Sequence, residues 1–254
     1  MSLLADLLAS VRDVQSLVVA SAVAGPRFTA VAGGPEQGAA ATVCGVAYTG
    51  AGESDPAFDA TAASAGLTAR LRNRPLLDVA QDPQEAGAAA LNALLAAQRL
   101  AEGTVFGDEN GLDLIARLSA GKRLAVVGAF PYLKTIRVEA AQSWVLELEP
   151  EDDQLPASAA PEVIPQADVV GITGSTLANG TLEGLLALCR RETFVAIIGP
   201  TTPLSPVLFD YGADVLCGSL ADDVRAVLES VAVDRSTRRI PGMRQVSLRP
   251  SRSR

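Results

Sequence analysis

The chain has 254 residues, of which 48% are hydrophobic and only 4% aromatic, and its formal net charge is −8. It contains no histidine, which excludes Ser-His-Asp and Cys-His catalytic systems and any metal site built on imidazole. No apolar run reaches the roughly 18 residues of a transmembrane helix, and residues 1–15 lack the basic start and apolar centre of a signal peptide.

Cysteine spacing and charge restrict the compartment and the partners. Cys44, Cys189 and Cys217 are far apart, which argues against disulfides or a zinc knuckle and suits a reducing compartment. Residues 235–254 carry seven arginines and no acid, which leaves 14 basic and 29 acidic residues, or −15, elsewhere. We therefore predict a cytoplasmic protein that binds neither nucleic acid nor a membrane. The basic tail could contact an anion, but a solvated end is the favoured interpretation.

The first part of the chain predicts a helix and a small antiparallel sheet. Residues 1–15 have the pattern of an amphipathic helix. Three strand-like runs follow, at residues 16–23, 27–32 and 41–48. Turns at Gly25-Pro26 and Gly33-Gly34-Pro35 separate these runs, which predicts an antiparallel meander.

A loop and a second helix are predicted next. Residues 50–66 are rich in Gly, Ala, Ser and Asp, which favours a loop. Apolar residues spaced three or four apart predict a helix over residues 84–100, with Asp82-Pro83 at its start. Residues 103–111 are the expected link to a second domain.

From Lys122 onward, predicted strands alternate with helices. The strands are expected at residues 124–128, 144–148, 168–173, 194–199 and 213–217, and the clearest helices at 182–190 and 221–231. Near-continuous apolar strands separated by helices indicate a parallel sheet covered on both faces. We therefore predict the α/β class, with a small α+β domain over residues 1–105 and a Rossmann-like parallel-sheet domain over residues 106–254.

Ligands of such sheets bind beyond the carboxyl ends of the strands, and the loops there carry suitable residues. Gly128, Pro131 and Tyr132 follow the first strand, although a single glycine gives only a weak dinucleotide signal and also fits a tight turn. Glu147 lies 19 residues after Gly128, close to the spacing at which dinucleotide-binding folds place an acid on a ribose hydroxyl. An ordinary acidic loop is the alternative.

The loop after the third strand is dense in polar residues and glycines. Thr173, Gly174, Asn179, Gly180 and Thr181 offer hydroxyl, amide and main-chain groups to a ligand. Asn179 or Thr181 could instead cap the following helix. Capping needs only one such residue, so we expect ligand binding here.

Three further positions have two interpretations each. The proline-rich loop with Gly199, Pro200 and Thr201 is either a ligand contact or a stiff connection. Asp210 is either a carboxylate ligand, for instance of a metal, or a residue at a helix end. Asn92 lies in an alanine-rich helix and needs a partner, so it either ties the helix to a loop or faces the cleft between the domains.

Several segments resemble a known family. Residues 127–131, 171–182 and 199–212 closely resemble the family called "putative heavy-metal chelation", domain of unknown function 364. Residues 28–31 and 87–95 are similar to its usual partner, domain of unknown function 4213. The resemblance covers about residues 10–235. It implies an enolase-N-terminal-like domain, a Rossmann-like domain and a site between them, with metal chelation as the suggested activity.

Three functions remain open from the sequence. The favoured one is a small-ligand or metal-binding protein with its site in the interdomain cleft. Asp210, Glu147 and Cys217 are conceivable metal ligands, and carboxylates would suit Mg²⁺ or Mn²⁺. The second is an enzyme with an adenosyl-type nucleotide cofactor on Glu147 and Tyr132, Lys134 or Asp210 in proton transfer. The third is a non-catalytic interaction protein. A small molecule or metal ion is the expected partner, and a homodimer is compatible with the composition.

Overall fold

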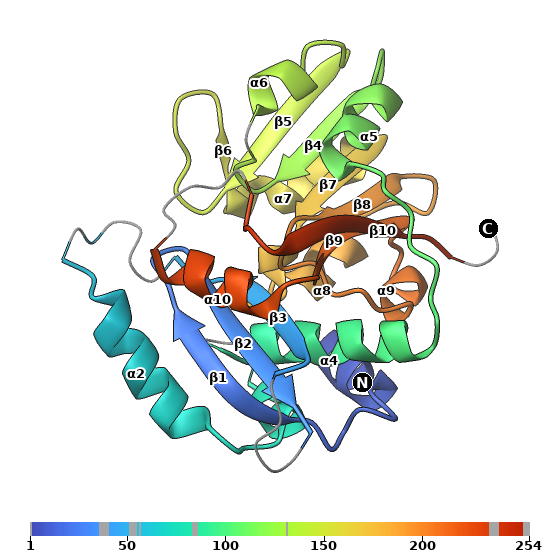
Figure 1. Ribbon diagram of the computed structural model, residues 1–254. Coiled ribbons are helices and arrows are strands. Elements are labelled where there is room, and N and C mark those ends of the chain that lie inside the picture. Colours follow the sequence, from blue (N-terminus) through green and yellow to red (C-terminus); the bar gives the residue numbers. More distant parts are fainter. Residues whose placement is uncertain are drawn as a thin grey trace.

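The computed structural model describes residues 2–35, 41–50, 55, 57–82, 86–130, 132–233 and 239–250. These residues form two β-sheets, a three-stranded antiparallel one and a seven-stranded, mainly parallel one (Figure 1). The predicted α/β class is confirmed. The helices are α1 (Leu3–Ser10), α2 (Ala60–Leu71), α3 (Leu76–Ala80), α4 (Ala88–Ala101), α5 (Gly111–Leu118), α6 (Leu133–Ile136), α7 (Ala160–Val163), α8 (Leu182–Ala187), α9 (Val207–Asp210) and α10 (Val224–Val233). Within the described residues, no helix is both long and apolar enough to cross a membrane.

The small sheet is the predicted meander. Its strands are β1 (Val18–Ala24), β2 (Phe28–Gly34) and β3 (Val43–Tyr48), paired in that order. Side chains alternate between its faces, so Val31 and Ala47 pack into the cluster that contains α4, whereas Ala32 and Val46 pack against α10. The small sheet is therefore covered on both faces, on one side by a helix from the end of the chain.

Glycine at position 45 allows α4 to lie directly on β3. A Cβ at this position would come within 2.2 Å of the Ala89 carbonyl oxygen and 2.4 Å of the Ala93 nitrogen. Both are main-chain atoms of α4, so no side chain could turn away to make room. The alanine-rich surface of α4 serves the same close approach. The predicted start of this helix falls on residues 83–85, outside the described residues.

The loop predicted over residues 50–66 is wrong in its second half, where α2 begins. The Asp59 carboxylate caps the helix by accepting from the backbone N–H groups of Thr61 (2.9 Å) and Ala62 (3.0 Å). Alanine has the highest helix propensity, and with this cap it outweighs the Ser, Gly and Thr residues that suggested a loop. Residues 51–54 and 56 lie outside the described residues.

The large sheet has the order β10-β9-β8-β7-β4-β5-β6. Its strands are β4 (Arg123–Val127), β5 (Gln142–Glu147), β6 (Leu155–Pro156), β7 (Val169–Thr173), β8 (Phe194–Ile198), β9 (Val215–Ala221) and β10 (Met243–Leu248). All pairs except β9–β10 are parallel. The order reverses between β4 and β7, whose connections run to opposite sides of the sheet.

Both faces of the large sheet are buried, which explains the near-continuous apolar strands. Along β4, Leu124 and Val126 pack with α5 and α6. Ala125 and Val127 point the other way, into the cluster with α7, α8 and α9. A strand covered on both sides needs apolar residues at every position, as the sequence pattern indicated.

The basic C-terminal segment is not the solvated end that the sequence suggested, as far as residue 250. Residues Met243–Leu248 form β10, whose Val246 and Leu248 are buried against the sheet. Arg244 pairs with Asp222 at 2.9 Å and Arg249 pairs with Glu109 at 2.6 Å. The arginines favoured a solvated segment in the sequence analysis, because their acidic partners lie far from them in the sequence and could not be recognised. Residues 234–238 and 251–254 lie outside the described residues.

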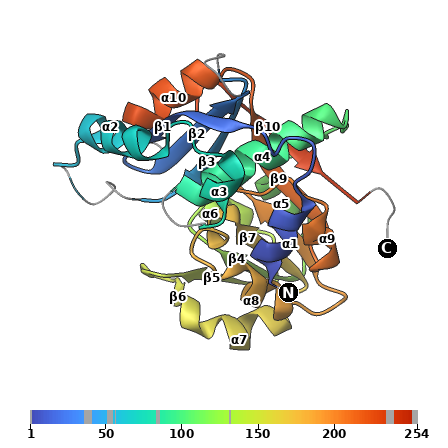
Figure 2. The same ribbon diagram turned by 90° about the horizontal axis from the view of Figure 1, so that it is seen from below.

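The first helix docks on the half of the protein that contains the large sheet. In Figure 2, α1 lies beside α9. The Tyr211 hydroxyl donates to the Asp6 carboxylate at 2.7 Å, and the Leu3 N–H donates to the Glu183 carboxylate at 2.9 Å. The hydrogen bond to Asp6, with burial second, raises the pKa of Tyr211 to about 12. Contacts at both ends of the chain therefore join the two halves.

The close approach at Gly45 gives a first prediction. Gly45→Ala should lower the free energy of unfolding by about 1–3 kcal/mol because α4 must move away from β3. Gly184→Ala in α8 is the control, since a Cβ there meets nothing within 4 Å, and it should raise stability by about 0.5–1 kcal/mol. Chemical denaturation measures both. Equal effects of the two substitutions would contradict this account of the packing.

Candidate functional site

A cleft of about 1600 Å³ lies between the two sheets. The carboxyl ends of β4, β5, β7 and β8 open into it, and residues from β2, β3 and α2 form the opposite wall. Because the strand order of the large sheet reverses between β4 and β7, the loops after these strands diverge and leave room for a ligand.

Most of the residues singled out from the sequence line this cleft. Those that line it are Gly128, Tyr132, Glu147, Thr173, Asn179, Thr181, Gly199, Pro200 and Thr201. Gly174, Gly180, Asn92 and Asp210 are not part of the lining, and Pro131 lies outside the described residues. The carboxyl ends of the parallel strands meet at one edge of the sheet, and loops up to about 70 residues apart in sequence therefore lie together there.

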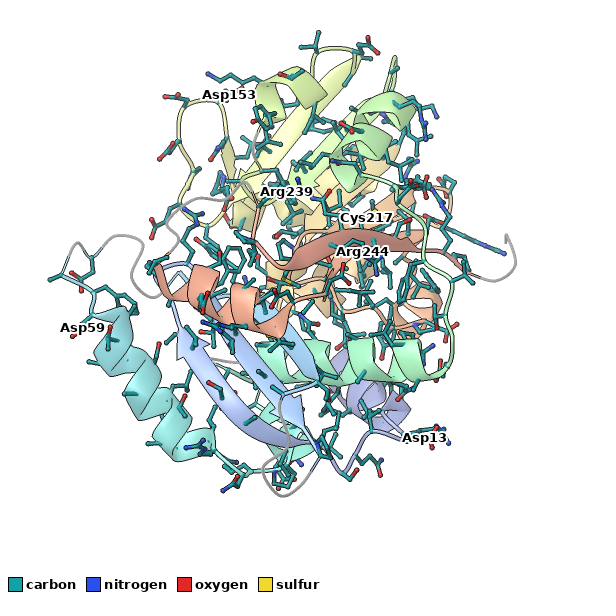
Figure 3. All side chains as sticks on the ribbon, viewed as in Figure 1. Asp13, Asp59, Asp153, Cys217, Arg239 and Arg244 are labelled. Carbon is teal, nitrogen blue, oxygen red and sulfur yellow. The ribbon has the colours of Figure 1, made fainter. Side chains whose placement is uncertain are left out.

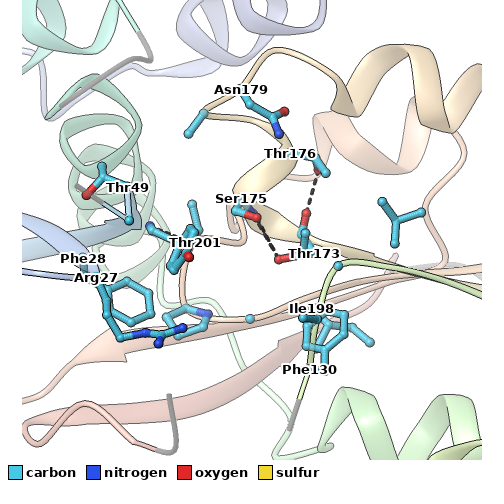
Figure 4. Close-up of a pocket in the computed structure, with 18 of the residues that line it drawn as sticks. Arg27, Phe28, Thr49, Phe130, Thr173, Ser175, Thr176, Asn179, Ile198 and Thr201 are labelled. Carbon is cyan, nitrogen blue, oxygen red and sulfur yellow. Dashed lines mark hydrogen bonds between the residues drawn. The ribbon is translucent and has the colours of Figure 1, made fainter. Parts of the chain in front are cut away.

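Two hydroxyl groups face the cleft at the end of β7. The Oγ1 of Thr173 and the Oγ of Ser175 lie 3.0 Å apart, and the Thr176 hydroxyl donates to the Thr173 carbonyl at 2.6 Å (Figure 4). Thr173 also caps the short 3-10 turn Gly174–Thr176. These bonds fix the direction of the hydroxyl pair while leaving each oxygen capacity for a further hydrogen bond.

Glycine is required in the loops that approach this hydroxyl pair. Gly128 has a φ of 109°, and a Cβ there would come within 2.7 Å of the Thr173 side chain. Gly174 is buried, and a Cβ on it would lie 2.4 Å from the Thr202 nitrogen. Gly128 thus brings the β4 loop against Thr173, whereas Gly174 packs the β7 loop against the β8 loop and does not reach the cleft.

The loop after β8 is joined to the small sheet through Thr201. Its Oγ1 accepts from the Tyr48 N–H at 2.9 Å, and its carbonyl accepts from the Asn92 amide at 2.9 Å. The same Asn92 amide nitrogen donates to the Val46 carbonyl at 3.0 Å. Asn92 and Thr201 are both buried. Two interpretations of Asn92 were open, and the structure agrees with the first: Asn92 ties α4 to a loop. We call these four residues the joint.

Asn179 and Thr181 lie at the exposed rim. The Asn179 Oδ1 accepts from the Thr181 hydroxyl at 2.6 Å and from the Thr181 N–H at 3.1 Å. Gly180 between them has a φ of 75°, the left-handed conformation of a tight turn. This turn leads into α8, so these residues serve the local structure as well as the edge of the cleft.

Acidic residues border the cleft beyond β5. Glu147, Glu149 and Glu151 all contribute to its lining. One Glu147 oxygen accepts from the neighbouring Leu148 N–H at 3.0 Å. Two large side chains at the same end of the cleft are exposed to solvent. Tyr132, which follows β4, is 66% exposed, and Leu148 is 70% exposed.

The wall from the small sheet was not found by sequence reasoning. The Arg27 guanidinium lies 5.6 Å from the centre of the Tyr48 ring, and Phe28 packs edge-on against the same ring at 5.7 Å. Figure 4 shows Arg27 and Phe28 on one side of Thr201, with Thr173 and Ser175 on the other. Strand-end rules apply to parallel sheets, so an antiparallel meander gave no signal for these residues.

The donor groups do not suit a soft metal ion. Within the described part of the chain, no three His, Cys, Asp or Glu side chains are grouped so that they could hold a metal. Cys217 is the cysteine that lines the cleft (Figure 3). Burial, with a smaller contribution from Glu109, raises its pKa from 9.0 to about 12. Asp210 is exposed on α9 and does not line the cleft.

The fold defines an α/β protein with an open cleft between a small antiparallel sheet and a large, mainly parallel sheet. The model of the DUF364 family, described as "Putative heavy-metal chelation", matches residues 110–248. This is more than half of the chain, which therefore belongs to that family. The match does not extend over residues 1–109, and the similarity of that part of the chain to domain of unknown function 4213 stays a prediction.

Two solved structures share the fold over nearly the whole chain. A DUF364 protein of unknown function from Desulfitobacterium hafniense DCB-2 has a TM-score of 0.77 and 24% identity, covering 97% of this chain and 96% of that one. A second, from Pyrococcus horikoshii, has a TM-score of 0.75 and 18% identity, covering 98% and 100%. No curated protein matches the chain.

The thiol environment gives a second prediction. Burial raises the pKa of Cys44, Cys189 and Cys217 to about 12 each, so at pH 8 roughly one thiol in ten thousand is ionised. A thiol-reactive disulfide reagent should modify the native protein at least about a hundredfold more slowly than the unfolded one. Rapid modification of native Cys217 would contradict this environment.

The same shifts predict alkaline destabilisation. Unfolded thiols lose their protons near pH 9.0, whereas the folded ones retain them up to about pH 12. Raised folded-state pKa values therefore stabilise the fold below pH 9.0, and that contribution is lost as the pH rises toward 12.

Proposed function

We propose that this protein binds a small organic ligand in the cleft between its two sheets. The observation that carries the proposal is the convergence of the loops after β4, β5, β7 and β8 on one cleft at the point where strand order reverses. Small molecules bind at this position in open α/β sheets. The volume of about 1600 Å³ exceeds that of a typical pocket, which favours an extended ligand.

The groups that face the cleft suit an organic molecule. The hydroxyls of Thr173 and Ser175 can donate or accept, while Phe28, Phe130 and Ile198 offer apolar surface. A mainly apolar lining with a few oriented polar groups is how small-molecule sites are usually built. The rigid proline loop around Thr201 adds to the proposal, because a site that is already ordered loses little entropy on binding.

Heavy-metal chelation, which the family description suggests, does not fit these residues. Soft metals bind thiolates and imidazoles, but the chain has no histidine, and among the described residues no three His, Cys, Asp or Glu side chains are grouped as metal ligands. The glutamates beyond β5 could attract a hard cation, yet in the described structure they are not grouped as a ligand set. We therefore assign the cleft to an organic molecule.

An enzyme with an adenosyl-type cofactor is a second candidate, favoured by one specific observation. The order β6-β5-β4-β7-β8-β9 corresponds to the 3-2-1-4-5-6 order of Rossmann-type sheets. Glu147 ends β5, the strand next to β4, where such folds place the acid that binds a ribose. Tyr132 lines the cleft nearby and is the candidate proton donor, whereas Lys134 and Asp210 do not line it.

Native mass spectrometry of gently purified protein tests the proposal. We expect a native mass above the denatured mass by roughly a few hundred daltons, the size of ligand that such pockets bury. Treatment with a chelator should not change this difference. An excess of tens of daltons that a chelator removes would contradict the proposal in favour of a metal.

The second candidate is tested in the same samples. Glu147→Gln should lose the added mass, and the released ligand should have the ultraviolet spectrum of an adenine. Glu162→Gln is the matched control, because Glu162 is exposed on α7 and does not line the cleft. Equal retention of the ligand by both variants would contradict a role of Glu147 in binding it.

A further inference from the structure

Strand β9 extends further than the strand on one of its sides. In Figure 1, β9 lies between β8 and β10. On the β8 side the pairing ends with Ile198 and Cys217, whereas on the β10 side it continues to Ala221 and Met243. The residues of β9 that follow Cys217 therefore have a neighbouring strand on one side only.

The main chain of Ser219 points to the side of β9 that has no neighbour. The N–H and the C=O of one strand residue face the same neighbouring strand, and this direction alternates along the chain. The Cys217 carbonyl accepts from the Gly199 N–H at 2.9 Å, so the main chain of Cys217 faces β8. Ser219 is two residues further on, and its N–H and C=O therefore face the same way.

Pairing with β10 does not use these two groups of Ser219. Its partner in the register is Gln245. Ser247 exchanges two main-chain hydrogen bonds with Gly107, at 2.8 and 2.9 Å, on the far side of β10. Gln245 is two residues before Ser247, so its main chain also faces away from β9. Ser219 and Gln245 are therefore a non-hydrogen-bonded pair of the antiparallel ladder.

The loop after β8 does not provide partners for Ser219 either. If β8 continued, the Gly199 carbonyl would accept from the Ser219 N–H, but it accepts from the Thr202 N–H at 3.0 Å. Among the described residues, none forms a hydrogen bond with the main chain of Ser219. Ser219 and Gly199 both line the cleft, and a Cβ on Gly199 would meet no described atom within 4 Å. The donor and the acceptor of Ser219 therefore border open space in the cleft.

We infer that the ligand of the cleft contains a peptide-like unit, whose N–H and C=O bind the C=O and the N–H of Ser219 as a further strand would. This inference rests on the proposed function and adds the chemical class of the ligand. A ligand that displaced water from Ser219 without replacing its hydrogen bonds would leave a donor and an acceptor unpaired, which is costly. Extended peptides bind the free edges of sheets through the same main-chain pairing.

Nuclear magnetic resonance of the Ser219 amide tests the inference with a defined probe. The probe is N-acetylalanine N-methylamide, and its control is the same molecule with both nitrogens methylated, which cannot donate a hydrogen bond. We expect the probe to shift the Ser219 amide signal saturably and to slow the hydrogen exchange of this amide. The methylated molecule should bind about tenfold more weakly, because the Ser219 carbonyl then has no donor.

Two variants separate the main chain of Ser219 from its side chain. Ser219→Pro removes the N–H, and Gly218 before it has no Cβ that would clash with the proline ring. This variant should lose binding of the probe, observed through the signals of the probe itself. Ser219→Ala is the matched control, because it keeps the N–H, and it should bind the probe as the wild type does. Circular dichroism should show that both variants are folded.

Three results would overturn the inference: no saturable shift of the Ser219 signal, equal binding of the probe and its methylated form, or equal binding by the two variants. If Ser219→Pro did not fold, the comparison of the two molecules on the wild type would decide. A co-purified ligand that contains no amide would also overturn the inference, while the proposed function would stand.

Discussion

The arrangement of the site depends on the joint formed by Asn92, Thr201, Tyr48 and Val46. The Asn92 amide donates to main-chain carbonyls of both halves, and the Thr201 hydroxyl accepts from the Tyr48 N–H. Each buried group that lost its partner would cost about 1–3 kcal/mol, so the β8 loop cannot slide along β3 without a large penalty. The joint therefore resists relative movement of the β8 loop and β3, which belong to opposite walls of the cleft.

The joint explains how residues from distant parts of the sequence act together. Thr173 and Ser175 reach the cleft from the large sheet, whereas Arg27 reaches it from a turn of the small sheet, stacked on the Tyr48 ring that the joint holds. We propose that one organic molecule in the cleft contacts residues from both sheets. The same cleft offers a soft metal little, because Cys217 is the one cysteine among its described lining residues and the chain has no histidine.

The sequence predicted well where burial leaves a strong pattern. Strands buried on both faces, such as β4, are apolar throughout, and their carboxyl ends located Gly128, Glu147 and Thr173 at the cleft. Prediction from the sequence failed where an element is stabilised by contacts that its own residue pattern does not reveal. The β10 strand was hidden by arginines whose partners lie far along the chain, and α2 by small residues that a single Asp59 cap stabilises. Arg27 could not be predicted as a cleft residue, because the sequence around it does not indicate that the turn between β1 and β2 faces the large sheet.

Hydrogen exchange at the Tyr48 amide tests the central claim, that the joint holds the two sheets in place, most directly. This N–H donates to the Thr201 hydroxyl and not to a neighbouring strand. Thr201→Val keeps the shape of the side chain and removes that acceptor. The account predicts strong protection of the Tyr48 amide in the wild type, and loss of it in the variant while the β2–β3 ladder remains protected. Unchanged protection of this amide in the variant would contradict it.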